Sequence, residues 1–255
     1  SGIRRTLCTI GYLRNYLECM ILKKILFTLS IIAVVFMIVV GLWTLSKSRT
    51  FQFFGNIYSR MNTTEKVVAL TFDDGPTDKT DEILSILSKL DIKATFFVIG
   101  SDLEKDMSEG QKIVASGHEL GNHTYSHNRM VLKSYNYIKN EIEKTDQLIE
   151  EAGYKGEIVF RPPNGKKLFL LPYYLKQHNR KTIMWDLEPD SYPEIMSSSE
   201  KITNYVMENV KPGSIILLHV MYDSRQVMLE SVEGIVNGLR EQGYTFKTVS
   251  ELLEY

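Results

Sequence analysis

Apolar residues along most of this chain recur with two different spacings. A continuous apolar run at residues 67–72 has the length of a strand, and in the following residues 79–90 apolar positions recur three or four apart, which predicts a helix with one buried face. Short apolar runs and amphipathic segments continue to alternate downstream. The further predicted elements are a strand at 94–99, a helix ending near residue 115, and helix and strand pairs at 135–151 and 157–161, 171–178 and 181–187, 198–209 and 214–220, and 225–241 and 245–249.

Strands that alternate with helices predict an α/β fold with a mainly parallel sheet. An open doubly wound sheet and a closed barrel both satisfy this pattern, because the number of strands does not decide whether a sheet closes. Residues 65–255 have the length of a single domain with one core.

One uncharged apolar run, at residues 25–45, is long enough to cross a bilayer as a helix. Lys23 and Lys24 precede it, so the positive-inside rule predicts a cytoplasmic N-terminus and an exported C-terminal part. The run is longer than a usual signal-peptide core, and residues 41–50 contain no small-x-small cleavage motif. We therefore expect an uncleaved signal-anchor in a single-pass protein of the cell membrane, with an extracytoplasmic catalytic domain.

This apolar run divides the chain into parts with different expected roles. Cys8 and Cys19 both precede the run, so disulfides are expected to have no part in the exported domain. The aromatic residues at 51–54 can lie at the membrane interface or pack on the domain. The expected parts are a cytoplasmic N-terminal segment at 1–24, the transmembrane signal-anchor at 25–45, a stalk at 46–64 and the main domain at 65–255.

The charges of the chain are nearly balanced, with 30 Lys and Arg against 31 Asp and Glu. This balance does not indicate a nucleic-acid-binding surface, and the sequence has no Walker loop, dinucleotide-binding glycine motif or internal repeat. We therefore expect no nucleic-acid partner. The candidate chemistry lies in the polar residues that follow the predicted strands.

Two of these polar groups have the composition of a metal-dependent site. Asp73 and Asp74 end the predicted strand 67–72, and the carboxyl ends of strands are where catalytic residues gather in (β/α) barrels. His123 and His127 follow another short strand. Two imidazoles and one carboxylate are typical ligands of a catalytic divalent ion, and three protein ligands leave a coordination position for water.

Two further strand ends carry Arg161 and His219. Arg161 enters a stiff Pro-Pro turn, and its guanidinium can hold a carboxylate ionised and oriented. His219 follows a strongly apolar strand and is placed like a general acid. Each motif alone has an ordinary structural explanation, as a solvated turn, a surface or core histidine, or a Pro-rich loop.

Four motifs in one order give this chain a family resemblance. Residues 71–76, 123–127, 161–165 and 217–219 resemble the motifs of the polysaccharide deacetylase family, which is the NodB-homology group, carbohydrate esterase family 4. The resemblance covers roughly residues 65–255. It implies a distorted, incomplete (β/α) barrel, preceded here by one N-terminal transmembrane helix.

The resemblance also implies a role for each matching residue. Asp73 would be the catalytic base, Arg161 would orient it, and His219 would be the general acid. The metal ligands would be Asp74, His123 and His127.

One family motif is altered in this chain, which reads WDLEPDSY where relatives usually carry an acidic residue followed by Asp-Trp. We expect Asp190 to support His219, with Glu188 as the second choice, and Tyr192 to take the place of a groove-lining Trp. Asn164 stands where relatives often have Tyr, and its backbone N–H is the implied donor to the oxyanion. The expected oxyanion or substrate contacts are Asn164, Tyr125, Trp185 and Tyr192.

Together these residues suit hydrolysis of an amide such as the N-acetyl group of a hexosamine. The expected function is metal-dependent removal of N-acetyl groups from an extracytoplasmic N-acetylglucosamine polymer, with peptidoglycan favoured and chitin oligomers or poly-N-acetylglucosamine as alternatives. The expected cofactor is one divalent ion, zinc first, with cobalt or manganese as alternatives. The expected partners are this polysaccharide and a bacterial membrane, while the oligomeric state is not indicated.

Two other functions remain open from the sequence. One is a catalytically inactive, membrane-anchored glycan-binding module, which the altered motif favours. The other is an esterase that removes O-acetyl groups from xylan.

Overall fold

The computed structural model describes the backbone of residues 2–255 and the side chains of residues 17, 18 and 20–255. The expectation about Cys8 and Cys19 therefore lies outside the described side chains. The chain forms two compact units, which divide between Leu45 and Ser46.

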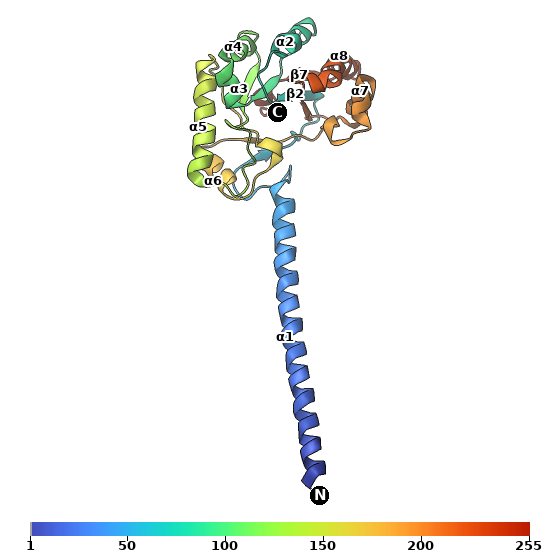
Figure 1. Ribbon diagram of the computed structural model, residues 1–255. Coiled ribbons are helices and arrows are strands. Elements are labelled where there is room, and N and C mark those ends of the chain that lie inside the picture. Colours follow the sequence, from blue (N-terminus) through green and yellow to red (C-terminus); the bar gives the residue numbers. More distant parts are fainter. Residues whose placement is uncertain (1) are drawn as a thin grey trace. The chain divides into compact units, whose positions relative to one another are not determined.

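The first unit is formed by the long helix α1 (Gly2–Ser46; Figure 1). Within it, Met20–Ser46 has a mean hydropathy of 3.0 over its most apolar stretch, and none of that stretch is buried. Its length and composition are sufficient to cross a membrane, and a signal sequence near the N-terminus has the same properties.

The second unit is built on a parallel sheet. Its strands are β1 (Ile57–Tyr58), β2 (Val67–Asp73), β3 (Thr95–Val98), β4 (Glu119–Asn122), β5 (Thr182–Ile183), β6 (Ile215–Leu218) and β7 (Thr245–Lys247). The order β4-β3-β2-β6 places β2 at the centre, β7 pairs with the start of β2, and β1 pairs with β5. All of these ladders are parallel, which confirms the predicted α/β fold.

Single-residue bridges extend the pairing beyond these ladders. Phe160 bridges Asn122 at the end of β4 and Thr182 in β5, and Leu187 bridges Ile216 in β6. The predicted strand at 157–161 is reduced to a single bridge residue, Phe160. Backbone bonds flank this bridge, since the Asn122 N–H donates to the carbonyl of Val159 at 2.8 Å and the Arg161 N–H donates to the carbonyl of Asn122 at 3.0 Å. The two prolines that follow Arg161 have no N–H with which to continue the pairing. Closure of the sheet into a barrel stays a prediction.

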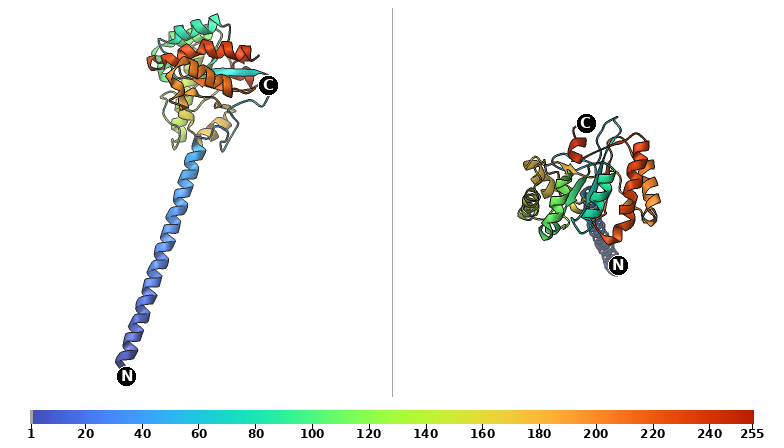
Figure 2. Two further views of the ribbon diagram at one scale, coloured as in Figure 1. Left: turned by 90° about the vertical axis from the view of Figure 1, so that its right-hand side faces the viewer. Right: turned by 90° about the horizontal axis from the view of Figure 1, so that it is seen from above.

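The amphipathic segments form helices that lie around the strands (Figure 2). Their bounds agree closely with the apolar spacing, because each helix buries one face. The helices of this unit are α2 (Thr80–Lys89), α3 (Gly100–Lys105), α4 (Met107–Ala115), α5 (Tyr135–Glu151), α6 (Leu170–Gln177), α7 (Ser199–Asn209), α8 (Gln226–Glu241) and α9 (Val249–Leu252).

Strand β2 is buried on both faces. Leu70 and Phe72 belong to the larger core, which includes side chains of α2 and α8, whereas Val67 and Ala69 belong to a second cluster that includes Val249 of α9. A strand covered on both faces can expose polar groups only at its ends. The carboxyl end of β2 is therefore where its two aspartates reach the cleft described below.

Residues 46–58 pack against the rest of the second unit. The ring of Phe53 lies 4.5 Å from that of Phe169, and the ring of Phe54 lies 5.6 Å from that of Tyr173, measured between centroids. β1 adds backbone pairing with β5. Of the two placements that the sequence left open for residues 51–54, the structure therefore shows contact with the domain.

Candidate active site

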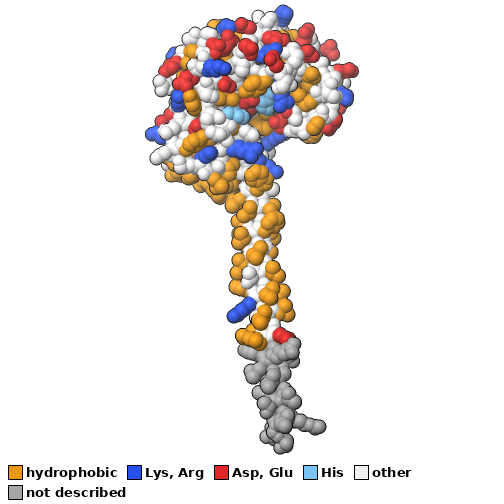
Figure 3. All heavy atoms as spheres, viewed as in Figure 1, with side chains coloured by type: hydrophobic (Ala, Val, Ile, Leu, Met, Phe, Trp, Pro, Cys, Tyr) orange, Lys and Arg blue, Asp and Glu red, His pale blue; other side chains and the backbone are white. Residues whose placement is uncertain are grey.

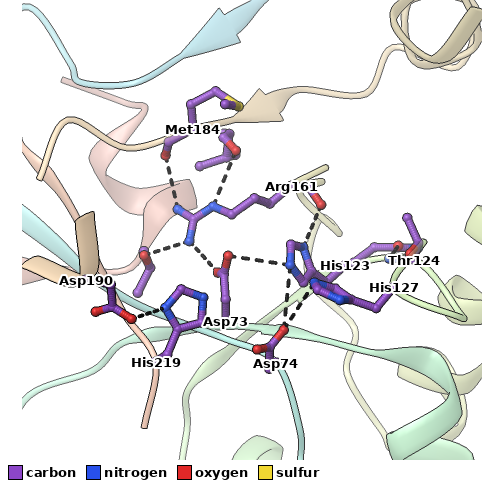
Figure 4. A network of polar contacts seen from close by, with 12 residues as sticks. Asp73, Asp74, His123, Thr124, His127, Arg161, Met184, Asp190 and His219 are labelled. Carbon is purple, nitrogen blue, oxygen red and sulfur yellow. Dashed lines mark hydrogen bonds and ion pairs between the residues drawn. The ribbon is translucent and has the colours of Figure 1, made fainter. Parts of the chain in front are cut away.

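The register of the parallel strands brings four separated motifs to one edge of the sheet. Asp73 is paired with Phe97 in β3, Val98 with Asn122 in β4, and Phe72 with Leu218 in β6. The residues that follow these positions therefore meet, because parallel strands end at the same edge. The bridge between Asn122 and Phe160 adds Arg161 to the same place (Figure 4).

Arg161 is fully buried and holds Asp73. Its Nη1 donates to Asp73 Oδ1 at 2.6 Å and to Thr71 Oγ1 at 2.9 Å, and its Nη2 donates to the carbonyl of Met184 at 3.1 Å. Burial alone would raise the pKa of Asp73, but the guanidinium, with His123 and His219, outweighs burial and holds the pKa below its usual value. Asp73 is therefore ionised at neutral pH.

Asp74, His123 and His127 form a cluster with three converging ligand atoms. One atom from each residue lies within 4.8 Å of the other two. Asp74 has a φ of 75° and His127 a φ of 54°, both in the left-handed region. Neighbouring residues on a strand normally point to opposite faces, so this turn of the backbone at Asp74 is what brings its carboxylate to the same site as that of Asp73.

The chemistry of this cluster fits a divalent cation. Asp74 Oδ1 is buried and accepts no hydrogen bond from the described residues, while the Nε2 atoms of His127 and His123 lie 3.4 and 3.9 Å from it. The Nδ1 of His123 lies 2.8 Å from the carbonyl of Arg161, which can only accept a hydrogen bond, so Nδ1 carries the proton and Nε2 is left for a ligand bond. Burial lowers the pKa of His123 despite the nearby aspartates, which keeps the imidazole neutral.

His219 lies on the other side of Asp73 and is supported by Asp190. Its Nδ1 lies 3.0 Å from Asp190 Oδ2, and Arg225 Nη1 contacts the same oxygen at 3.1 Å. Burial alone would lower the pKa of His219, but the hydrogen bond with Asp190 and the charges of the neighbouring aspartates raise it above its usual value. Glu188, the second candidate, accepts instead from Arg49 at 2.5 Å.

A cleft of about 510 Å³ opens over these groups, and it is lined by Asp73, His123, His127, Asp190 and His219. Two of the expected substrate contacts, Asn164 and Trp185, lie on its wall. The other two do not line it. Tyr125 donates to Glu104 at 2.5 Å beneath the Lys144 ammonium, and Tyr192 packs against Tyr205 with 5.2 Å between ring centroids. Both rings are held by these partners, and the expectation that Tyr125 and Tyr192 contact substrate stays a prediction.

The sequence did not indicate that residues 46–49 would contribute to the cleft. Lys47 and Arg49 line it, and the Arg49 guanidinium lies 4.7 Å from the centroid of the Trp185 ring. Lys167 holds this segment through its backbone N–H, which donates to the carbonyl of Ser46 at 2.8 Å, and through its ammonium, which donates to the carbonyl of Ser48. Burial lowers the pKa of Lys167 to about 8. The basic and polar composition of the segment was the only available signal, and it is equally typical of a linker.

Comparisons with known proteins found related sequences. Residues 60–183 match the family model described as polysaccharide deacetylase. A peptidoglycan-N-acetylglucosamine deacetylase of Bacillus cereus is 34% identical over 192 residues, which cover 75% of this chain and 90% of the relative. A bifunctional xylanase/deacetylase of Pseudobutyrivibrio xylanivorans is 34% identical over 207 residues, which cover 78% of this chain and 32% of the relative.

A solved structure shows the same fold. It is a mutant with restored enzymatic activity of a CE4 family pseudoenzyme from Bacillus anthracis, and it superposes with a TM-score of 0.70 at 32% identity over 78% of this chain and 71% of the other. The identity to the Bacillus cereus relative extends over nearly the whole of that protein. The chain is therefore an enzyme of the polysaccharide deacetylase family, carbohydrate esterase family 4.

Proposed function

We propose that this chain is a membrane-anchored, metal-dependent deacetylase that removes N-acetyl groups from N-acetylglucosamine units of peptidoglycan. The observation that carries the proposal is the placement of an ionised aspartate, Asp73, between a three-residue cation site and a histidine that is held by Asp190. These are the groups that hydrolysis of an unactivated amide needs.

Asp74, His123 and His127 would hold one divalent cation in this site. The chemistry supplied by a bound ion is Lewis-acid activation, which acidifies water and polarises the acetyl carbonyl. Zinc is the first choice for two imidazoles and a carboxylate, and cobalt or manganese suit the same ligands.

Asp73 would act as the general base. It takes a proton from the water whose oxygen attacks the acetyl carbon, and Arg161 keeps the carboxylate ionised and fixed for this step. The N–H of Asn164 would donate to the oxygen that becomes negative as the carbonyl is attacked. Asn164 lies at the cleft in a left-handed turn, with a φ of 55°, which supports this assignment.

His219 would act as the general acid. It donates its proton to the amide nitrogen as the bond between carbon and nitrogen breaks, so that acetate and a free amine leave. Asp190 would position the ring and keep it protonated, and Trp185 would form the wall beside the sugar. This division of roles gives the two ionisable groups opposite protonation states at the same pH.

The named relatives support the substrate class and keep one alternative open. Deacetylases named for peptidoglycan include the Bacillus cereus relative, whereas the relative from Pseudobutyrivibrio xylanivorans is a xylanase and deacetylase. Removal of O-acetyl groups from xylan is therefore the second candidate activity. The similar pseudoenzyme shows that the fold can lack activity, but Asp73, its three cation-site neighbours and His219 all converge here, which favours catalysis.

We also propose that α1 is an uncleaved membrane anchor and that the sheet forms an incomplete barrel. Helix α1 would cross the membrane through residues 25–45, within the apolar stretch Met20–Ser46, with residues 1–24 cytoplasmic and the catalytic unit outside. The bridges at Phe160 and Leu187 support an incomplete barrel, since they link β4, β5 and β6 through single residues.

Acetate release tests the proposed activity. Residues 46–255 are expected to release acetate from peptidoglycan, with less release from chitin oligomers and acetylated xylan. A chelator is expected to abolish release and added zinc to restore it. Preferential release from xylan would replace the first candidate by the second, and no release by folded, zinc-bound protein would refute both.

Two substitutions separate the base from the cation site. Asp73→Asn is expected to retain zinc and lose about 10²- to 10⁴-fold in kcat, because only the proton acceptor is removed. His127→Ala is expected to weaken zinc binding at least about 100-fold, because a ligand atom is lost. Zinc titration and acetate release measure the two effects, with His178→Ala as a control histidine outside the site. Equal loss of zinc in both variants would contradict the assignment.

The support of His219 by Asp190 predicts a pH effect. His219 must be protonated to act as the acid, so kcat/KM falls as pH rises through its pKa. Removing the Asp190 charge lowers that pKa, so Asp190→Asn is expected to move the alkaline fall of the pH profile to lower pH, while Asp190→Glu moves it less. Glu188→Gln is the matched control. A shift in the control instead would assign the supporting role to Glu188.

The contribution of residues 46–49 predicts that the N-terminal boundary matters for activity. Arg49→Gln in residues 46–255 is expected to lower kcat/KM about tenfold, equivalent to about 1.4 kcal/mol, because Glu188 and Trp185 lose the guanidinium that holds them. A fragment beginning at Thr50 is expected to lose at least as much. Lys89→Gln, an exposed lysine on α2, controls for the lost charge, and unchanged kcat/KM in Arg49→Gln would contradict the contribution of the segment.

A further inference from the structure

A cluster of large apolar side chains is exposed on the second unit. We call it the aromatic surface, and each member is between 36 and 88% exposed. Among residues 46–255 every exposed Phe and Leu belongs to it, and the other exposed large apolar residues are three tyrosines located elsewhere. Figure 3 shows hydrophobic side chains gathered along the lower margin of this unit. The members are Phe51, Phe53, Phe54, Leu132, Phe169, Leu170 and Tyr173.

The aromatic surface is continuous. Phe53 contacts both Phe51, at 5.3 Å between centroids, and Phe169, at 4.5 Å. Leu132, Phe169 and Leu170 line one hollow of about 250 Å³ together with Lys133. Isolated exposed apolar residues are ordinary on protein surfaces, but a joined group drawn from three separate segments indicates an interaction surface.

The charged residues within the segments that build the aromatic surface all have one sign. The three segments that build it, residues 46–56, 128–135 and 163–173, contain no Asp or Glu. Their cations include Lys133, which lines the hollow. They also include Arg129, which lies close enough to Lys166 for its positive charge to contribute to lowering the pKa of Lys166. Arg49 is paired with Glu188, so its charge is already balanced within the unit. An apolar area whose own segments carry cations and no acidic residue is the composition of a surface that binds anionic lipid.

Chain continuity limits how far this surface can be from a membrane. Phe51 follows the end of the candidate membrane span, Ser46, by five residues. Even a fully extended chain of that length reaches only about 18 Å. If α1 is the anchor, the aromatic surface is tethered within reach of the headgroups in any arrangement of the two units.

We propose that the aromatic surface is a membrane-docking surface that rests on anionic phospholipid headgroups, with its rings at the interface and its cations against lipid phosphates. The proposal rests on α1 being the anchor of the proposed function. Rings at the interface and lysines against phosphate are both favourable there, and the bilayer would cover the apolar area that the second unit leaves exposed.

The full chain offers a direct test, because it has only two tryptophans, Trp43 in α1 and Trp185 in the cleft. In a Trp43→Phe background, Phe53→Trp places a reporter on the aromatic surface. Its fluorescence is expected to be quenched by vesicle lipids brominated close to the headgroup, whereas the background protein, reporting only Trp185, is not quenched. Equal, weak quenching in both proteins would overturn the proposal.

The second unit contains its own buried clusters, so residues 46–255 can also be tested without the anchor. This fragment is expected to sediment with vesicles containing phosphatidylglycerol and much less with pure phosphatidylcholine. A Phe53→Ser, Phe169→Ser, Leu170→Ser variant is expected to need at least about tenfold more lipid for half-binding. Tyr255→Ser is the control for an exposed aromatic residue elsewhere.

Docking would be contradicted if the triple variant bound vesicles as well as the wild type, or if the wild type bound both vesicle types equally. Concentration-dependent self-association without lipid binding would also contradict it, and would indicate that a second copy of the chain covers the aromatic surface. Acetate release from soluble chitin oligomers is measured on the same proteins and is expected to be unchanged by the triple substitution. Loss of lipid binding with unchanged acetate release would therefore test only the docking surface. Absence of acetate release with normal lipid binding would count only against the proposed enzymatic function.

Discussion

The buried pair of Arg161 and Asp73 is the interaction on which the rest of this site depends. One guanidinium reaches two side chains of β2 and the backbone carbonyl of Met184, which follows β5, so it joins segments that are distant in the sequence at the closed end of the cleft. A charge without solvent is very costly when its partner is missing, so neither residue can be replaced without leaving the other uncompensated. The same pair sets the protonation state of Asp73. This one contact therefore both joins the segments of the site and keeps Asp73 ionised.

The site also depends on unusual backbone conformations. Asp74, Thr124, His127 and Asn164 all have positive φ, and all lie in or beside the site. Such conformations are unfavourable for residues other than glycine, and they persist only where surrounding contacts fix them. The Thr124 N–H, for example, donates to the Asn122 side chain at 2.8 Å. The ligand atoms converge because these turns redirect side chains that regular strands would point apart.

These two features explain what the sequence could and could not predict. Apolar spacing was sufficient for the helices and the parallel strands, since both follow from which face is buried. It overestimated the strand at residues 157–161, where the pairing is confined to a bridge at Phe160 and the backbone bonds that flank it. Motif order was sufficient to predict that Asp73, His123 and His219 lie at one edge of the sheet, but side-chain direction depends on tertiary partners. Tyr125 is turned away by Glu104, and Arg49 reaches the cleft from a segment with no strand or helix pattern of its own.

The hydrogen bond from His123 to the carbonyl of Arg161 has an evolutionary consequence. A backbone carbonyl is present whatever side chain the codon specifies, so the orientation of this imidazole is protected from point mutation at position 161, whereas the guanidinium is not. Two contacts of residue 161 therefore depend on different parts of it: its backbone carbonyl orients the His123 ring, and its side chain holds Asp73.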